Sequence, residues 1–416
     1  MNFRKARQPT SRNPDSLVRR GCWAVLWTAL LAIGLPARGE TDAKADPSAV
    51  TEIEGFARLA RRAANEEKWP LADHFLGLLG GVNAPDKAKK AAFQGLAEDY
   101  EKHHQVSKAI AVYEKMADLY PEAPDTPKLI FHLGILYRES GAPKLAIARF
   151  FTVLSSTLKF GTKDLDAYRA LAQSAQWEIA ETFFQSGDFQ KAQNYYALLS
   201  RIDLPGPEMA RVRFKLTHCL FLMNDVAGAI TAAQSFLQSF PDDPAAAECR
   251  YLLASAFRSQ GKHAEAFETV LALLHHENAR QEKAPEKWIY WKKKAGNEFA
   301  NFYYQKSDTL SALTLFQAIA KLGEEPEWQW PVIYQMGLCF ERLRHAGRAA
   351  EAYKYIIDEA KKPGRESAKL PETLRTLLDM AGWRAKQLAW TDGATVKLER
   401  LLTNPLASSA PEPLKP

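Results

Sequence analysis

The chain has 416 residues, more than one compact core usually organises, so several domains or an elongated repeat are expected. Its formal charge of +6 arises in residues 1–39, which hold seven of the 55 basic residues and one of the 49 acidic residues, leaving 48 of each beyond. A neutral remainder argues against a surface that follows nucleic-acid phosphates, so no nucleic-acid partner is expected.

Residues 1–39 have the three parts of a secretory signal. Basic residues extend from Arg4 to Arg20, an apolar run follows from Cys22 to Pro36, and small residues at Ala37 and Gly39 precede Glu40. We predict cleavage before Glu40 and an exported, periplasmic protein. The alternative is an inner-membrane anchor at 21–37, because these 17 uncharged residues reach the lower length limit of a membrane span.

A helix-turn-helix pattern recurs along the next three hundred residues. Each copy has large and small apolar residues on one face of a first helix, then an alanine and an aromatic residue on a second helix. The alanines are Ala72, Ala109, Ala146, Ala192, Ala229, Ala266, Ala312 and Ala349. Small residues let paired helices approach closely, and large ones fill the space between neighbours.

The repeats form a second, longer period. Successive alanines are separated by 37, 37, 46, 37, 37, 46 and 37 residues, which gives a period of 120 residues containing three repeats. We therefore predict an all-α, right-handed solenoid of about eight repeats. The nine extra residues, near Gly161–Arg169 and Gln281–Ile289, are expected to lengthen the first helix of the repeats that contain them.

The chain ends give the remaining boundaries. We predict a linker at 40–50, the solenoid at 51–370, and a capping region at 371–403, with a helix from Leu374 to Trp390. Residues 404–416 are rich in proline and alanine and are expected to be a flexible tail.

The repeat pattern of residues 51–357 resembles the tetratricopeptide repeat (TPR) family. The junctions Tyr120–Pro124 and Phe236–Pro244 are similar to those of bacterial envelope TPR proteins, such as the outer-membrane β-barrel assembly lipoprotein and the periplasmic Tol–Pal coordinator. The resemblance implies a periplasmic adaptor that binds envelope proteins. The chain departs from these proteins because Cys22 precedes the apolar run, where a lipidated cysteine would follow it, and because it has more repeats.

No sequence motif predicts catalysis, a cofactor or a metal site. The adjacent histidines, His103 with His104 and His275 with His276, point about 100° apart on a helix, so one metal cannot easily take both. Beyond the signal the chain has Cys219, Cys249 and Cys339, which lack Cys-x-x-Cys spacing and are expected to be small core residues.

The first helices of stacked TPRs line an inner groove, and equivalent positions on them are rich in aromatic residues and arginine. Such residues are typical anchors of peptide-binding surfaces. The predicted groove residues are Phe131, Arg138, Trp177, Phe184, Phe214, His218, Phe221, Tyr251, Arg258, Asn297, Asn301, Tyr304 and Tyr334. The alternative is that the aromatic residues pack against one another inside the solenoid.

The sequence thus predicts an exported, non-catalytic scaffold that binds a protein or extended peptide in this groove. Two alternatives remain open at this point. The protein could be a structural subunit of an envelope complex that uses its convex face or edges, or an accessory domain that partners a separately encoded enzyme. Membrane contact is possible but is not required by any of these hypotheses.

Overall fold

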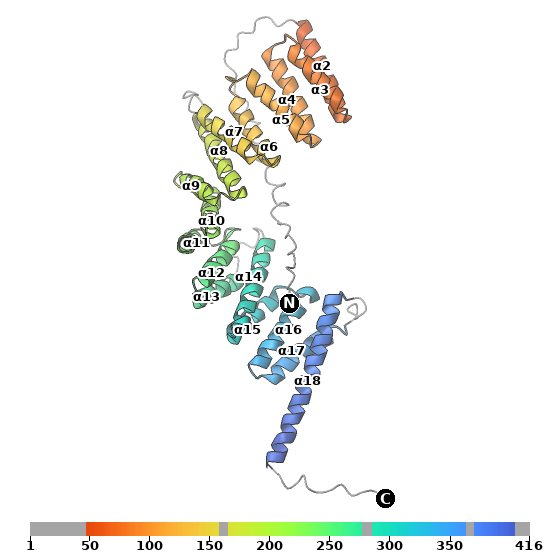
Figure 1. Cartoon of the computed structure of the whole chain (residues 1–416), viewed down its shortest axis with the longest axis vertical. Helices are drawn as coiled ribbons and strands as arrows, with labels where there is room; N and C mark the ends of the chain where they lie inside the picture. Colours follow the sequence, from red (N-terminus) through yellow and green to blue (C-terminus); the bar gives the residue numbers. More distant parts are fainter. Residues whose placement is uncertain (1–46, 158–164, 277–284, 363–369, 404–416) are drawn as a thin grey trace, which may run out of the picture. The chain divides into compact units, whose positions relative to one another are not determined.

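The computed structural model describes residues 47–157, 165–276, 285–362 and 370–403 (Figure 1). Every regular element in these ranges is helical, which confirms the all-α prediction. The predicted signal peptide at 1–39 and the predicted tail at 404–416 lie outside the described residues.

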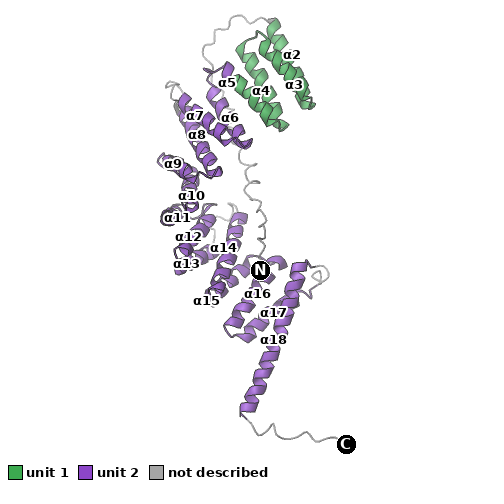
Figure 2. Ribbon diagram, in the orientation of Figure 1, with its two compact units in different colours: residues 1–116 green, residues 117–416 purple. Residues whose placement is uncertain are grey.

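The chain divides into two compact units, residues 1–116 and 117–416 (Figure 2). Unit 1 contains α2 (Pro47–Asn65), α3 (Trp69–Gly81), α4 (Asp86–Lys102) and most of α5 (Val106–Leu119). Unit 2 contains α6 (Thr126–Glu139), α7 (Pro143–Thr157), α8 (Leu165–Gln185), α9 (Phe189–Leu199), α10 (Gly206–Leu222), α11 (Val226–Ser239), α12 (Ala246–Ser259), α13 (His263–His275), α14 (Pro285–Gln305), α15 (Thr309–Ile319), the 3-10 turn η2 (Ala320–Leu322), α16 (Pro326–Arg342), α17 (Ala346–Glu359) and α18 (Glu372–Thr403).

Each unit is built from helical hairpins whose first helices also touch. In unit 1, α2 packs on α3 and α4. In unit 2, each helix packs on the next along the chain, and contacts also join α6 with α8, α10 with α12, α12 with α14, and α16 with α18. Within each of these contacting pairs, side chains on the first helices link one repeat to the next.

The 120-residue period of the sequence is also a period of the structure. α6 and α12 have bounds offset by 120 residues, and so do α8 and α14. The three repeats with Ala109, Ala146 and Ala192 (α4–α9) form the first block, and those with Ala229, Ala266 and Ala312 (α10–α15) form the second. Both α8 and α14 have 21 residues, whereas α6 and α12 have 14, which confirms that the third repeat of each block has the longer first helix. The segments just before these long helices, 158–164 and 277–284, lie outside the described residues.

The turn between the two helices of each hairpin contains one residue with positive φ. Glycine occupies it at Gly141, Gly187 and Gly261. Residues with side chains occupy it at Glu67, His104, Asn224, Ser307 and Arg344, with φ between 57° and 65°. These eight positions follow the same alternation of 37 and 46 residues as the alanines, so the turns repeat with the helices.

Close packing of the hairpins depends on glycine opposite an aromatic ring. A Cβ atom at Gly337 would lie 2.5 Å from Cε1 of Tyr353, and one at Gly134 would meet the ring of Phe150. Both rings belong to the second helix of the same repeat, so any side chain at either glycine would push the two helices apart.

Two boundaries differ from the sequence prediction. α2 begins at Pro47, inside the predicted linker at 40–50. α18 continues to Thr403, although the sequence predicted that its helix would end near Trp390. The predicted helix end coincided with the last tryptophan of the sequence. The helix nevertheless continues through Asp392-Gly393, a dipeptide typical of turns, and ends just before Asn404 and Pro405.

Candidate functional site

Four of the predicted groove aromatics pack on a ring of the second helix in their own repeat. The ring pairs and the distances between centroids are Phe131–Phe150 at 5.6 Å, Trp177–Tyr196 at 5.5 Å, Phe214–Phe236 at 5.9 Å and Tyr334–Tyr353 at 5.4 Å. Phe214 and Tyr334 are only 8% and 5% exposed, which at these two positions favours the alternative of aromatic packing inside the solenoid over a groove. At these two positions the ring fills the space inside the hairpin rather than a groove.

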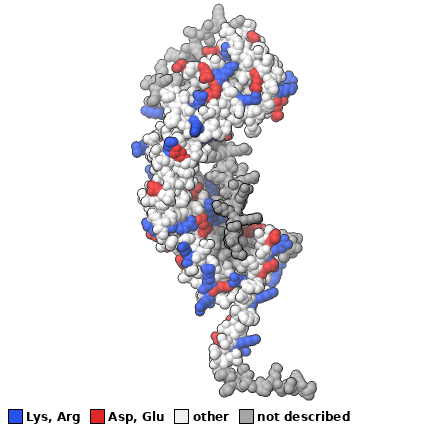
Figure 3. All heavy atoms as spheres, viewed as in Figure 1, with Lys and Arg blue, Asp and Glu red and all other residues white. Residues whose placement is uncertain are grey.

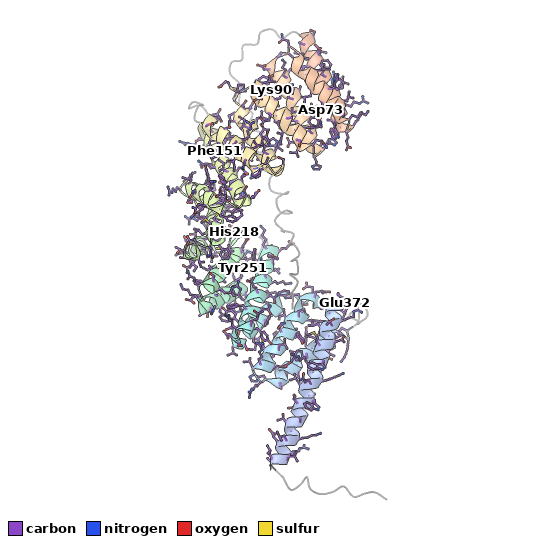
Figure 4. The ribbon with its side chains drawn as sticks, viewed as in Figure 1. Asp73, Lys90, Phe151, His218, Tyr251 and Glu372 are labelled. Carbon is purple, nitrogen blue, oxygen red and sulfur yellow. The ribbon has the colours of Figure 1, made fainter. Side chains whose placement is uncertain are left out.

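Phe184, His218 and Phe221 are three more predicted residues, and the first two pack on each other between α8 and α10. The His218 ring lies 5.3 Å from the Phe184 ring and 5.8 Å from the Phe214 ring. Phe221 packs partly buried against the core of unit 2. His218 on α10 and Tyr251 on α12 are labelled in Figure 4. The aromatic character of these positions is therefore explained by packing between neighbouring first helices.

The two predicted arginines form ion pairs with the following repeat. Arg138 donates to Glu178, with exposed side-chain fractions of 14% and 1%. Arg258 donates to Glu298 at 2.7 Å, with exposed fractions of 26% and 36%, and the Tyr251 hydroxyl donates to the same carboxylate at 2.8 Å. Both arginines already pair with a carboxylate of the protein, so neither offers an unpaired positive charge to a ligand.

On α8 the surface beside the ion pair is closed. The Arg211 guanidinium lies 4.1 Å from the centre of the half-buried Trp177 ring. One turn further along α8, Glu181 accepts a hydrogen bond of 2.6 Å from the Tyr196 hydroxyl and pairs with Lys215 at 3.0 Å. These side chains leave α8 with a buried polar network between α6, α9 and α10.

The carboxylates of α8 respond differently to burial. Burial raises the pKa of Glu178, and the opposing attraction of Arg138 does not fully compensate. Burial also acts on Glu181, but the nearby Lys215 charge and the Tyr196 hydrogen bond outweigh it and hold the pKa of Glu181 below its usual range.

On α14 the equivalent surface is open. A pocket of about 560 Å³ lies against α14 and the end of α12. It is lined by Arg258, Lys294, Asn297, Glu298, Asn301, Phe302 and Gln305. Because six of these seven side chains are polar or charged, the pocket offers hydrogen-bonding groups rather than an apolar cavity.

The difference between the two surfaces follows from substitutions across the 120-residue period. Trp177 of α8 corresponds to Asn297 of α14, and Glu181 corresponds to Asn301. The side-chain amide of Asn301 donates to the backbone carbonyl of Asn297 at 2.8 Å and to its amide oxygen at 3.1 Å. Two small amides therefore stand where the first block has a tryptophan and a buried carboxylate.

One wall of the pocket is held by cation–ring contacts. The Lys294 ammonium lies 4.5 Å from the centre of the Trp291 ring and 5.1 Å and 5.8 Å from the centres of Tyr251 and Tyr290. These contacts orient a positive charge at the rim of the pocket, and among the described residues no carboxylate forms an ion pair with it. Tyr304, by contrast, is covered by Arg342, whose guanidinium lies 3.5 Å from the ring centre.

Of the predicted groove residues, Arg258, Asn297 and Asn301 line the pocket. The other lining residues were not predicted from the sequence and lie within about one turn on the same face of α14: Lys294, Glu298, Phe302 and Gln305. Comparing the two 120-residue blocks position by position would have indicated this face, because a tryptophan is replaced by an asparagine there. Within the described residues, no helix is long and apolar enough to cross a membrane.

The cysteine prediction agrees with the structure. Cys219, Cys249 and Cys339 are buried and free. Burial raises the pKa of each thiol, to about 12 for Cys219 and about 11 for Cys339. They are core residues with little thiolate at neutral pH.

The sequence model of the YfiO outer membrane lipoprotein family matches residues 169–287. These residues extend from α8 to the start of α14, and they have the helical hairpins and the repeating alanine pattern described above. The chain is a tetratricopeptide-type repeat protein that resembles envelope adaptors of this class. The matched segment ends before Lys294, so most of the pocket lies beyond it.

Solved TPR structures also match the chain. A TPR protein from Parabacteroides merdae aligns over 70% of this chain and 97% of its own, at 15% identity and a TM-score of 0.38. The C-terminal part of a TPR protein from Cytophaga hutchinsonii aligns over 67% of this chain and 100% of its own, at 14% identity and a TM-score of 0.44. Comparison with curated proteins found no similar sequence.

Proposed function

We propose that this TPR protein is an exported, non-catalytic scaffold that holds an extended segment of a partner protein at the α14 pocket. The observation that carries the proposal is the pocket itself, where Asn297 and Asn301 replace the tryptophan and glutamate of the closed first block. Of the thirteen groove residues predicted from the sequence, the proposed site contains three: Arg258, Asn297 and Asn301. The proposed site is therefore polar rather than aromatic.

The chemistry of the lining suits a polypeptide backbone. An extended segment exposes N–H donors and C=O acceptors that need partners once water is removed. Asparagine and glutamine amides supply both kinds of group, and Asn297, Asn301 and Gln305 are spaced about one turn apart along α14. A volume of about 560 Å³ accommodates a few residues of such a segment.

Charge at the rim favours a partner segment that carries a carboxylate. Lys294 is positioned by three rings, and Arg258 lies beside it with its charge shared by Glu298. A carboxylate approaching Lys294 would gain a charge-assisted hydrogen bond without breaking the Arg258–Glu298 pair. We therefore expect an acidic residue in the bound segment.

Two observations support the proposal that the protein is exported. Residues 1–39 have the pattern of a cleaved signal, and the matching family is described as an outer membrane lipoprotein. Sequencing the amino terminus of the mature protein is expected to show a start near Glu40. A mature chain that begins at Met1 and remains in the cytoplasm would remove the envelope part of the proposal.

The binding site can be tested with a matched pair of positions. Gln305 lines the pocket, and Gln185 is its equivalent at the end of α8. Each residue is replaced in turn by a photoreactive amino acid in the full chain, and cells are irradiated. We expect a cross-linked partner polypeptide from position 305 and none from position 185. Cross-linking from Gln185 or from Asn194 on α9, but not from Gln305, would favour the structural-subunit alternative.

A further inference from the structure

α18 has a packed half and an exposed half. Its packing face includes the buried Leu374 and Ala381, with Leu377 and Leu388 partly buried against α16 and α17. Beyond Leu388 this packing stops, and every residue from 389 to 403 is exposed. These 15 residues form about four helical turns, or about 22 Å of helix, with no covering layer from the described part of the chain.

The exposed half carries large apolar side chains on one face. At about 100° per residue, Trp383, Trp390, Ala394 and Leu401 lie in one stripe, on the side of α18 opposite Ala381. Trp383, Trp390 and Leu401 are 60%, 73% and 49% exposed. Leu398 and Leu402 border the stripe and are also exposed. Lys397 interrupts the stripe and the exposed Val396 lies outside it, but three large apolar side chains exposed along one side of a helix are typical of an interaction site.

The charged residues are sorted around this stripe. By the same helical spacing, Lys386, Lys397 and Arg400 lie along one edge of the stripe, whereas Asp392 and Glu399 lie on the face away from it. In Figure 3, the exposed end of α18 shows mainly uncharged atoms with basic side chains along one side. The surface that a partner would meet is therefore apolar and basic, and the acids face away.

We propose that the exposed half of α18, residues 389–403 together with Trp383 and Lys386, docks on the surface of an anionic lipid bilayer. Tryptophan favours the headgroup region, where its ring is buried and its N–H remains hydrated. Lysine and arginine beside the stripe meet lipid phosphates while their alkyl chains extend along the apolar face. The helix lies in the interface, since 22 Å of helix cannot cross a hydrocarbon core of about 30 Å.

The charge pattern favours an anionic bilayer over a second copy of the chain as the partner of this surface. Two α18 stripes packed together would leave Lys386, Lys397 and Arg400 without opposite charges, because Asp392 and Glu399 lie on the other face of each helix. An anionic bilayer supplies a negative charge at every point along the basic edge. The inference does not depend on the α14 pocket, with which it shares no residue.

The experiment places a polarity-sensitive fluorophore on either side of α18 in the full chain. The labelled variants are Leu401→Cys in the stripe and Glu399→Cys on the opposite face, both in a Cys22→Ser background. The buried native cysteines react slowly, because burial raises their thiol pKa values. Vesicles contain equal parts of phosphatidylcholine and phosphatidylglycerol, or phosphatidylcholine alone.

We expect a blue shift at position 401 but not at 399 with anionic vesicles, and at least a tenfold weaker response with phosphatidylcholine alone. Trp390→Ala and Lys397→Glu should each weaken the response at 401 several-fold, whereas Leu310→Ala, an exposed leucine on α15, should leave it unchanged. The absence of a vesicle-dependent shift at position 401 would overturn the proposal. A shift that appears without vesicles and grows with protein concentration would also overturn it, and would indicate that α18 pairs with a second copy of the chain.

Discussion

The pairs α6–α8 and α12–α14 occupy equivalent positions in the 120-residue period, but they use the same ion pair in different surroundings. In the first, Glu178 is 1% exposed beneath a surface closed by Trp177 and Arg211. In the second, Glu298 is 36% exposed at the edge of a pocket. The ion pair that links the repeats is therefore the same in both blocks, whereas the difference between Trp177 and Asn297 separates a packed surface from a candidate binding surface.

A position that recurs in every block need not have the same role in each. Arg138 and Arg258 both join one repeat to the next, so their recurrence in the sequence reflects stability. The positions that differ between blocks, Trp177 against Asn297 and Glu181 against Asn301, are where the surfaces diverge. In a solenoid, departures from the period are thus better guides to a binding site than the period itself.

The largest expected effect comes from breaking the two ion pairs in turn. Arg138→Ala leaves the buried Glu178 carboxylate without its cation, which typically costs about 3–5 kcal/mol. Arg258→Ala leaves a carboxylate that water can reach, and we expect a cost of about 1 kcal/mol. Urea denaturation of the full chain measures both free energies of unfolding, and equal costs would contradict the assignment of closed and open surfaces.

Exchanging the distinguishing residues tests the same contrast through packing. Trp177→Asn removes a ring packed between Tyr196 and Arg211, and we expect a loss of about 3 kcal/mol. Asn297→Trp places a ring in open space and should change stability by less than about 1 kcal/mol. Thermal unfolding followed by circular dichroism compares the two variants. A stable Trp177→Asn protein would mean that Trp177 does not close the α8 surface.

A smaller and pH-dependent effect is expected at Glu181. Because its folded pKa is lowered, the ionised carboxylate stabilises the protein above its unfolded pKa, and this contribution is lost as the pH falls through the folded value. Glu181→Gln should therefore cost about 1–2 kcal/mol at pH 7 and less at pH 3. Asn301→Gln at the equivalent position is the control, since its cost should not vary with pH.

The smallest expected effect concerns the turn after each long helix. Gly187 and Ser307 are equivalent and have φ values of 81° and 65°. Serine in this region carries a steric cost that glycine avoids, so Ser307→Gly should stabilise the protein by about 0.5–1 kcal/mol. Gly187→Ser should have the opposite sign. Denaturation midpoints of both variants test the predicted opposite signs. A lower midpoint for Ser307→Gly would contradict the prediction.

Much of the fold could be predicted because short sequence patterns that specify the helices and turns recur along the chain. The alanines and turn positions set the 37- and 46-residue spacing, and the longer α8 and α14 follow from it. The end of α18 was predicted too early, because residues 391–403 stay helical without a packed face and in spite of the turn-type dipeptide Asp392-Gly393.

The site could be predicted only in part. Spacing placed Asn297 and Asn301 on the first-helix surface, but it could not tell whether Phe214 and Tyr334 face a groove or a neighbouring ring. That choice depends on the distance between the helices of one hairpin, which the side chains of both helices determine together. An aromatic residue is equally suited to filling a core and to anchoring a peptide, so residue type alone does not decide.

If the second block binds a partner where the first block is closed, blocking the α14 pocket should prevent binding. The measurement is photo-cross-linking from position 305 in the unmodified chain and in the Asn297→Trp variant, with thermal unfolding as the check on folding. We predict that the tryptophan fills the pocket and abolishes the cross-linked partner while the unfolding temperature is unchanged. Undiminished cross-linking in a folded Asn297→Trp protein would contradict the account.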